Sequence, residues 1–200
     1  MEYMKKKTVF LDRDGTINIE KNYLYKPEDF EFIKNAPEAI KLLKDHDYQV
    51  IVVTNQAGVA RGYYTEEDVK HLHEYINEQL RKWNTSIDAF YYCPHHPTAG
   101  IGKYRVECNC RKPKTGMFEQ ACRDFEVDKE HSWMIGDNKG DIEAGKNFGL
   151  KTILVRTGYG EKVETEGIKE AIVVEDIYTA IRMIVKQNLE GGLMDGKSKY

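Results

Sequence analysis

The stretch TVFLDRDGTIN, residues 8–18, places two carboxylates one residue apart directly after a short apolar run. The run, residues 9–11, contains β-branched and aromatic side chains that favour the pleated surface of a strand. Asp12 and Asp14 follow it, although like charges this close repel unless a positive group lies between them. The stretch therefore predicts a buried strand that ends beside a cation.

Similar apolar runs recur along the chain and are separated by longer segments with helical periodicity. This alternation predicts an α/β fold, a doubly wound and mostly parallel sheet with helices on both faces. Ligands bind outside the carboxyl ends of the strands in such sheets, which is where Asp12, Thr54 and Asp137 fall. The predicted strands are residues 8–11, 49–54, 87–92, 132–136 and 151–155, with 171–174 as a candidate sixth.

Three helices can be placed from the spacing of apolar residues. The clearest follows Thr65, where a capping-box pattern begins and apolar residues recur every three or four positions up to Trp83. A second has one apolar face between residues 118 and 125. A third runs from near residue 141 to Gly149, which suits a left-handed helix cap.

The composition is that of a globular protein that acts on small molecules. With 40% hydrophobic and 32% charged residues, the 200 residues suit one domain, expected over 1–188, followed by a disordered tail over 189–200. A net charge of −3 does not indicate the basic surface typical of nucleic-acid-binding proteins. No apolar run approaches the roughly 18 residues of a membrane span. The basic N-terminus is too short for a signal-peptide core, and four cysteines without a secretory signal argue against a disulfide framework. We expect a cytoplasmic monomer.

Asp12, Asp14 and Asp137 are predicted to converge on one hard cation. Magnesium suits carboxylate and water ligands and usually completes its octahedron with substrate phosphate. A metal-bound carboxylate is a poor proton donor, so one aspartate would act as nucleophile while the other moves protons. Taken alone, DRDGT at residues 12–16 is equally compatible with a solvated turn or a helix N-cap, because Asp-Gly is a common turn dipeptide.

Four short motifs resemble those of the haloacid dehalogenase (HAD) superfamily of phosphatases. In order, they are FLDRDGTIN (10–18), VVTN (52–55), RKP (111–113) and GDNKGD (136–141). All four occur in the order typical of the superfamily, and the resemblance covers about residues 8–158. It implies a Rossmann-like core. A large cap domain is not expected, since only 35 residues separate Asp14 from Val50.

The same resemblance implies a role for each motif residue. Asp12 is implied as the nucleophile that forms an aspartyl-phosphate, and Asp14 as the general acid and base. Asp12, Asp137 and the backbone carbonyl of Asp14 would hold magnesium. Thr54 and Lys112 would bind the oxygens of the transferring phosphoryl group, whose charge needs positive and donor groups around it. An alkoxide leaving group needs a proton whereas a halide does not, so Asp14 favours a phosphatase over a dehalogenase.

Two segments, YYCPHHP (91–97) and ECNCRKP (107–113), supply a second set of metal ligands. Cys93, His95, Cys108 and Cys110 make the Cys3His set of a closed tetrahedral zinc site. The C-x-H and C-x-C spacings are tighter than usual, so four unrelated residues in a polar loop remain an alternative, as does His96 in place of His95.

The segment of about residues 93–112, here called the zinc loop, leads directly to Arg111 and Lys112. A zinc ion tying its two ends would rigidify the segment that aims the lysine. Four protein ligands leave no open position for chemistry, so the expected role of the zinc is structural.

The remaining thiol and most histidines are expected outside both metal sites. Cys122 lies on an apolar helix face and is expected in the core. The histidines expected at the surface or on helix flanks are His46, His71, His73 and His131.

Longer segments narrow the resemblance to the D-glycero-D-manno-heptose 1,7-bisphosphate 7-phosphatase family. They are FLDRDGTIN, VVTNQAGVARG (52–62), YYCPHHP and CNCRKPKTGM (108–117). The family implies hydrolysis of the 7-phosphate of a phosphorylated sugar, with Mg²⁺ and Zn²⁺ as cofactors, and implies that Arg111 recognises the second phosphate. The other residues implied to contact substrate are Arg13, Glu20, Lys21, Asn22, Tyr23, Asn55, Gln56, Ala57 and Asn138. Asn138 is a departure, because members often have a basic residue there.

Two other functions stay open at this point. The related histidinol-phosphate phosphatase domain shares the general plan, including a zinc loop. The second is a catalytically silent module that binds a phospho-ligand or zinc. Such a module would require the loss of a catalytic residue, whereas the chain has all five: Asp12, Asp14, Thr54, Lys112 and Asp137. The heptose family is preferred because an arginine beside the catalytic lysine suits a doubly phosphorylated sugar.

Overall fold

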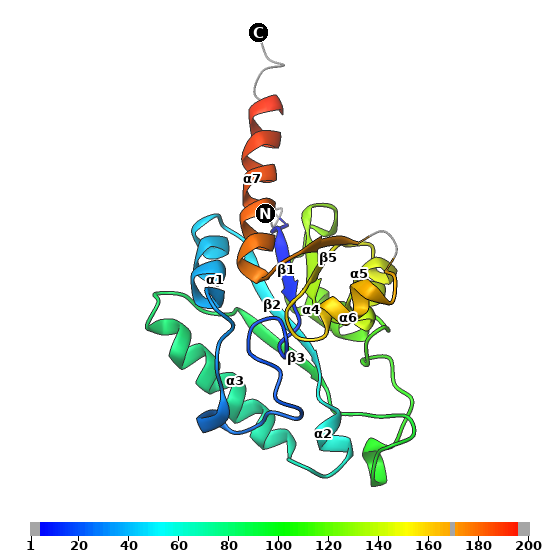
Figure 1. Ribbon diagram of the computed structural model, residues 1–200. Helices are drawn as coiled ribbons and strands as arrows, with labels where there is room; N and C mark the ends of the chain where they lie inside the picture. The colour runs from blue at the N-terminus through cyan, green and yellow to red at the C-terminus, as the bar shows by residue number, and fades with distance from the viewer. Residues whose placement is uncertain (1–4, 169–170, 196–200) are drawn as a thin grey trace.

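The described residues, 5–168 and 171–195 with side chains to residue 190 in this computed structural model, form one parallel six-stranded sheet. The strand order is β3-β2-β1-β4-β5-β6, which places β1 at the centre between β2 and β4 (Figure 1). The strands are β1 (Thr8–Leu11), β2 (Gln49–Asn55), β3 (Ala89–Cys93), β4 (Trp133–Gly136), β5 (Lys151–Val155) and β6 (Ile172–Val174).

All six predicted strands are confirmed. β1 and β5 begin and end where the sequence predicted, and the other boundaries move by at most two residues. The agreement is close because strands in a parallel sheet are buried on both faces, so their apolar runs are nearly continuous.

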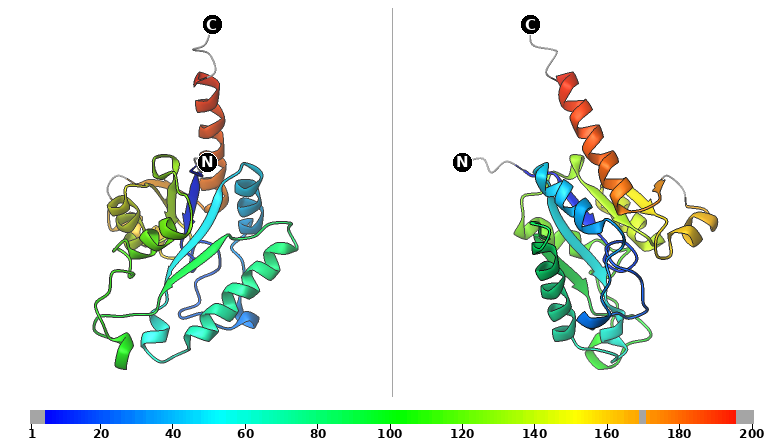
Figure 2. Two further views of the ribbon diagram at one scale, coloured as in Figure 1. Left: turned by 180° about the vertical axis from the view of Figure 1, so that it is seen from behind. Right: turned by 60° about the vertical axis from the view of Figure 1, so that its left-hand side comes forward.

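Helices cover both faces of the sheet, as the views in Figure 2 show. Val9 and Leu11 of β1 share a core with one set of helices, whereas Phe10, between them, packs with the other set. The first set is α1 (Ala36–Asp45), α3 (Glu66–Arg81) and α7 (Ile177–Asp195), and the second is α4 (Gly116–Asp124) and α5 (Lys139–Phe148). Short helices complete the described chain: α2 (Ala57–Ala60), α6 (Gly160–Thr165), η1 (Pro27–Asp29), η2 (Gly102–Tyr104) and η3 (Lys129–His131).

The two predicted helix caps are confirmed. Thr65 caps α3 with a capping box, and Gly149 ends α5 in the left-handed conformation at φ 87°. Trp83 was wrongly included in the apolar stripe of α3, because the helix ends at Arg81 and the indole is 44% exposed.

The chain end differs from the predicted disordered tail. Residues 189–195 continue α7, which projects from the body of the molecule in Figure 1, while residues 196–200 lie outside the described residues. Among the described residues, every helix is too short or too polar to cross a bilayer.

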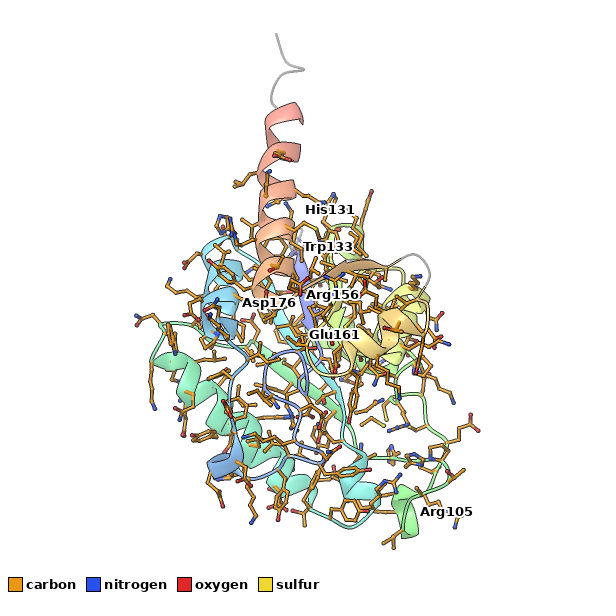
Figure 3. All side chains as sticks on the ribbon, in the orientation of Figure 1. Arg105, His131, Trp133, Arg156, Glu161 and Asp176 are labelled. Atoms are coloured by element: carbon orange, nitrogen blue, oxygen red, sulfur yellow. The ribbon has the colours of Figure 1, made fainter. Side chains whose placement is uncertain are left out.

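The long connections gather at the carboxyl ends of the central strands. The loop after β1 and the zinc loop after β3 both begin there. Figure 3 shows Arg105, in the zinc loop, at the opposite end of the molecule from His131 and Trp133, which mark the amino end of β4. The polar residues singled out in the sequence therefore meet at one edge of the sheet.

Candidate active site

Lys112 lies at the centre of this edge and is only 5% exposed. Its Nζ lies 2.7 Å from Asp12 Oδ1 and 2.7 Å from Asp141 Oδ1, and it donates to the Val53 carbonyl at 2.7 Å. Burial alone would lower the pKa of Lys112, but the two carboxylates outweigh it and raise the pKa above its usual range. The ammonium is therefore charged and held in place.

Three carboxylates converge around this lysine. Ligand oxygens of Asp12, Asp137 and Asp141 all lie within 4.8 Å of one another. Burial, followed by the charge of a neighbouring aspartate, raises the pKa of Asp12 to about 7 and that of Asp137 to about 9. When all three are ionised, one ammonium leaves two negative charges unbalanced, so the cluster suits a divalent cation.

The hydrogen bonds separate these carboxylates into two kinds. Asp141 uses one oxygen for Lys112 and accepts from the Asn138 amide at 3.0 Å with the other. Among the described residues, Asp12 Oδ2 and Asp137 Oδ1 accept no hydrogen bond, while Asp137 Oδ2 accepts from the Tyr159 amide at 2.8 Å. Asp12 and Asp137 thus keep free oxygens that fit a hard cation, and Asp141 orients the lysine.

Gly15 allows the turn after β1 to pass close to Asp137. Its φ is +82°, and a Cβ added there would lie 2.1 Å from Asp137 Oδ2. The glycine of the DxDGT motif is therefore required by space as well as by backbone conformation.

The Asp14 carboxylate lies outside the group of three and pairs with Arg13. Arg13 Nη2 donates to both Asp14 oxygens, at 3.0 and 2.9 Å, and the Asn18 amide donates to Oδ1 at 3.0 Å. The Arg13 side chain is fully buried at 0% exposure, and the substrate contact expected of it stays a prediction. Arg13 fixes the carboxylate next to it. The expected metal contact of Asp14 concerned its backbone carbonyl and stays a prediction.

Gln56 joins Asp14 to Thr54 beneath the site. Its Nε2 donates to Asp14 Oδ2 at 3.0 Å and to Thr54 Oγ1 at 2.8 Å, while its Oε1 accepts from Tyr64 at 2.7 Å. Gln56 is 2% exposed, and the substrate contact expected of it also stays a prediction. Because Thr54 accepts from Gln56, its own hydroxyl proton remains available for a phosphoryl oxygen.

Asn55 fixes the backbone of Lys112. Its Oδ1 accepts from the Lys112 amide at 3.1 Å, and its Nδ2 donates to the Lys112 carbonyl at 3.2 Å. The end of β2 is therefore fastened to the end of the zinc loop.

A polar pocket of about 280 Å³ opens over these groups. Of the predicted substrate-binding residues, Glu20, Asn55, Arg111 and Asn138 line it, together with Asp12, Asp14, Thr54, Lys112 and Asp137. Arg111 Nη1 donates to the His95 carbonyl at 3.3 Å, so the zinc loop holds the guanidinium at the wall.

Four other predicted contacts lie outside the pocket lining: Lys21, Asn22, Tyr23 and Ala57. Lys21 pairs with Glu31 at 3.3 Å, and Tyr23 packs edge-on against Tyr63. The left-handed conformations of Asn22 and Tyr23, at φ 50° and 62°, bend the chain after Glu20. As a result only Glu20 of that segment lines the pocket.

Asp141 and Tyr159 line the pocket although neither was predicted as a site residue. Asp141 is the last residue of GDNKGD and could have been included from the motif itself. Tyr159 lines the pocket, and its hydroxyl donates to Asn22 Oδ1 at 3.2 Å. It follows β5 within a glycine-containing turn, and no pattern in the sequence marks it.

The four predicted zinc ligands meet in one cluster. Cys93 Sγ lies 3.5 Å from Cys108 Sγ and 2.9 Å from Cys110 Sγ, and His95 Nδ1 lies 3.4 Å from Cys110 Sγ. Four ligands about 2.3 Å from a tetrahedral zinc ion lie roughly 3.8 Å apart. Cys93 Sγ and His95 Nδ1 have this separation and the sulfur–sulfur contacts are shorter, so the donor set suits such an ion once the thiols move apart. The four cysteines of the chain form no disulfide.

The alternatives to this set are resolved by geometry. His96 Nδ1 accepts from the amides of Thr98 and Ala99, at 3.3 and 3.0 Å, and so caps a turn. Cys122 packs at the margin of the core, as predicted. The prediction for His73 is wrong, since this side chain is only 5% exposed.

Comparisons with known proteins agree with the fold and the site. A HAD-hydrolase-like family profile matches residues 109–180. A 7-phosphatase for D-glycero-β-D-manno-heptose-1,7-bisphosphate from Haemophilus ducreyi is 45% identical over 86% of this chain and 93% of its own length. A relative from Photorhabdus laumondii, named for the α anomer, is 38% identical over 92% of this chain and its whole length.

A solved structure gives the same result. The D,D-heptose 1,7-bisphosphate phosphatase of B. bronchiseptica, complexed with magnesium and phosphate, superposes with a TM-score of 0.81 at 30% identity, covering 90% of this chain and 99% of its own. The fold and the aspartate–lysine site define a phosphatase of the HAD superfamily. Within that class, the chain belongs to the D-glycero-D-manno-heptose-1,7-bisphosphate 7-phosphatase family.

Proposed function

We propose that this enzyme hydrolyses the 7-phosphate of D-glycero-D-manno-heptose 1,7-bisphosphate through an aspartyl-phosphate on Asp12. The observation that carries the proposal is the pocket itself, which is lined by Asp12 and Lys112 and also by the guanidinium-bearing Arg111. One phosphate would lie beside Asp12 and react, while the guanidinium holds the other. The names of the relatives support this substrate.

Each step can be assigned to side chains around the pocket. Asp12 attacks phosphorus, and the bond from phosphorus to the sugar oxygen breaks as Asp14 gives that oxygen a proton. Water then attacks the phosphorus on Asp12 and gives a proton to Asp14, which restores both residues. Lys112 and the Thr54 hydroxyl hold the equatorial oxygens, and the network around Arg13 and Gln56 holds the proton carrier.

Asp12, Asp137 and the Asp14 carbonyl would hold a magnesium ion, which supplies positive charge to the phosphoryl oxygens when bound. The two uncommitted carboxylate oxygens and the excess negative charge of the cluster support this assignment. The B. bronchiseptica phosphatase, whose structure was solved as a complex with magnesium and phosphate, supports it as well.

Turnover should require magnesium. Protein stripped with EDTA should be inactive, regain full activity with Mg²⁺, and gain little with Ca²⁺, which prefers more ligands at longer distances. Because EDTA also removes zinc, elemental analysis must show that zinc is retained in the sample before metal is added back. Full turnover of metal-free protein would contradict the assignment of the cluster.

We further propose that Cys93, His95, Cys108 and Cys110 bind one structural zinc ion. The ligand cluster supports it, as does the contact from Arg111 to the His95 carbonyl. Zinc at this point would fix the segment from His95 to Lys112, and with it both the phosphate-binding guanidinium and the catalytic ammonium.

Purified protein should therefore contain about one zinc per chain, and Cys108→Ser should lose it. The variant should also lose most activity and melt at a lower temperature, because the zinc loop is no longer tied. Cys122→Ser is the matched control, since this thiol lies outside the cluster and should keep metal and rate. Zinc-free parent protein, or a Cys108→Ser variant with unchanged metal and rate, would refute the assignment.

Arg111→Ala should lower kcat/KM for the bisphosphate by about 10–100-fold, the value of a charge-assisted contact to phosphate. An aryl phosphate, which has no second phosphate, should be affected much less. Lys114→Ala is the control, because this nearby lysine is exposed and pairs with Glu107 instead. Equal losses on both substrates would show that Arg111 serves the reacting phosphate.

The substrate is tested by measuring turnover of both anomers of the bisphosphate and of histidinol phosphate under the same conditions. We expect at least one bisphosphate anomer to be preferred over histidinol phosphate, which has no second phosphate for Arg111. Preference for histidinol phosphate would overturn the proposed substrate. Both anomers are needed because the relatives include enzymes named for each.

We propose that the enzyme acts in the cytoplasm as a monomer on this small phosphorylated sugar, without a nucleic-acid or membrane partner. The thiolate ligands of the zinc loop support a reducing compartment, and the net charge of −3 supports a small-molecule substrate over nucleic acid.

A further inference from the structure

Arg13 carries a charge in the interior of the protein, which is rare without compensating partners. Its side chain is fully buried, and its guanidinium contacts Asp14 with both Nε and Nη2. Nη2 also lies 3.0 Å from the Leu24 carbonyl and 3.3 Å from Gln56 Oε1. The other terminal nitrogen, Nη1, points into the core.

His73 is the hydrogen-bond partner of that nitrogen among the described residues. Its Nε2 lies 3.3 Å from Arg13 Nη1. Arginine can only donate, so Nε2 must be the unprotonated nitrogen and the ring must be neutral with its proton on Nδ1. Burial, and then the charge of Arg13, hold the pKa of His73 well below its usual range, which agrees with a neutral ring.

Packing holds the imidazole in this orientation. The ring stacks on Phe90 of β3 with centroids 4.4 Å apart and planes 16° apart, and Tyr92 lies edge-on to it at 6.1 Å. His73 occupies a position on the buried face of α3 between Val69 and Ile76, where packing alone would favour an aliphatic residue. A polar side chain buried here needs a hydrogen-bond partner, and Arg13 is that partner.

We propose that His73 is a positioning residue for proton transfer: its Nε2 holds the Arg13 guanidinium, which in turn aims the Asp14 carboxylate at the leaving oxygen. The proposal rests on the proposed phosphatase mechanism, in which Asp14 moves the proton. His73 itself touches neither substrate nor the acidic cluster.

The contact matters because misplacement of a catalytic group by about 1 Å costs about 100-fold in rate. Without an acceptor at Nε2, Nη1 keeps a buried donor unsatisfied, and the guanidinium is expected to turn toward other acceptors. Asp14 would then lose the paired geometry at its two oxygens. Asp12 and Lys112 pair with each other, and their remaining side-chain bonds go to Val53 and Asp141, so they share no hydrogen bond with Arg13 or His73.

Three variants of His73 and one control test whether a hydrogen-bond acceptor is needed at the position of Nε2. His73→Gln places an amide oxygen about as far along the side chain as Nε2, whereas the oxygen of His73→Asn falls short and His73→Met offers no comparable acceptor. His71→Met is the matched control, because His71 lies exposed on the same helix. Melting curves and zinc content identify any variant that has lost its fold, and Asn and Met provide two independent tests.

The discriminating quantity is kcat/KM, which reports steps up to the first irreversible one, here the release of the alcohol from phosphorus. For the sugar bisphosphate this step needs a proton from Asp14. For p-nitrophenyl phosphate it does not, since the phenolate leaves unprotonated. A fault in aiming Asp14 should therefore appear with the sugar and spare the aryl substrate.

We expect His73→Met and His73→Asn to lower kcat/KM for the sugar bisphosphate by about 10–100-fold and for p-nitrophenyl phosphate by less than about threefold. His73→Gln should recover most of the loss. Equal losses on both substrates, no loss on either, or no recovery with Gln would overturn the proposal. Failure of the parent to turn over the sugar bisphosphate would instead refute the proposed substrate, and the comparison would then use any alkyl phosphate that the parent hydrolyses.

Discussion

Replacing Asp12 with asparagine should lower turnover of every phosphate ester by at least about 10⁴-fold, the scale seen when a nucleophile is removed. The amide cannot attack phosphorus, and two neighbouring carboxylates are committed to other partners. Asp14 is held by Arg13, and Asp141 by Lys112 and the Asn138 amide. Steady-state assays with the bisphosphate and an aryl phosphate measure the effect.

The fold should survive this substitution. Asp12 has its pKa raised to about 7, so its ionisation above pH 4 works against the folded state and that cost is greatest at alkaline pH. Removing the charge should therefore leave the melting temperature of the metal-free protein at pH 8 unchanged or higher, with Lys112 still paired to Asp141. A folded Asp12→Asn variant that keeps even a tenth of the parent rate would rule out Asp12 as the nucleophile.

Asp14→Asn should separate the two halves of the reaction. Asparagine keeps the shape of the side chain but cannot exchange a proton at neutral pH. Transfer from the sugar bisphosphate should slow by about 10²–10⁴-fold, because the alkoxide leaves without a proton. Transfer from an activated aryl phosphate should survive, while hydrolysis of the aspartyl-phosphate stalls.

Two signals would accompany that stall. A single burst of phenolate should appear, and mass spectrometry should find added phosphate on the peptide that contains Asp12. Asp12→Asn is the control and should show neither signal. Parent-like turnover of the sugar bisphosphate by Asp14→Asn would exclude Asp14 as the proton carrier and reverse the division of labour between the two aspartates.

Features determined by short-range pattern could be predicted from the sequence. The strands are continuous apolar runs, and Asp12, Thr54 and Asp137 lie at their ends, so their meeting at one edge of the sheet follows from parallel topology. The cluster of Cys93, His95, Cys108 and Cys110 was predictable for a similar reason, because two pairs close in sequence need only the loop to close on itself.

What could not be predicted depends on where long polar side chains point. Arginine is a residue type expected at a surface or in contact with substrate. The burial of Arg13 is possible because its guanidinium contacts Gln56 and His73, which are distant in sequence. His73 lies one helical turn from both Val69 and Ile76, so the spacing indicates that it faces the core. Because histidine is polar, it was nevertheless predicted at the surface. Tyr23 turns outward because of an unusual backbone conformation that residue type does not indicate.

In the proposed reaction, Asp12 takes the phosphate from carbon 7 and leaves the anomeric phosphate in place. Phosphorus NMR of D-glycero-D-manno-heptose 1,7-bisphosphate incubated with the enzyme and Mg²⁺ tests it directly, since the two phosphate esters give separate signals. We expect the 7-phosphate signal to be replaced by inorganic phosphate while the 1-phosphate signal persists. Loss of the 1-phosphate signal would refute this assignment. Persistence of both phosphate signals with the parent enzyme, in a spectrum identical to that obtained with Asp12→Asn, would refute it as well.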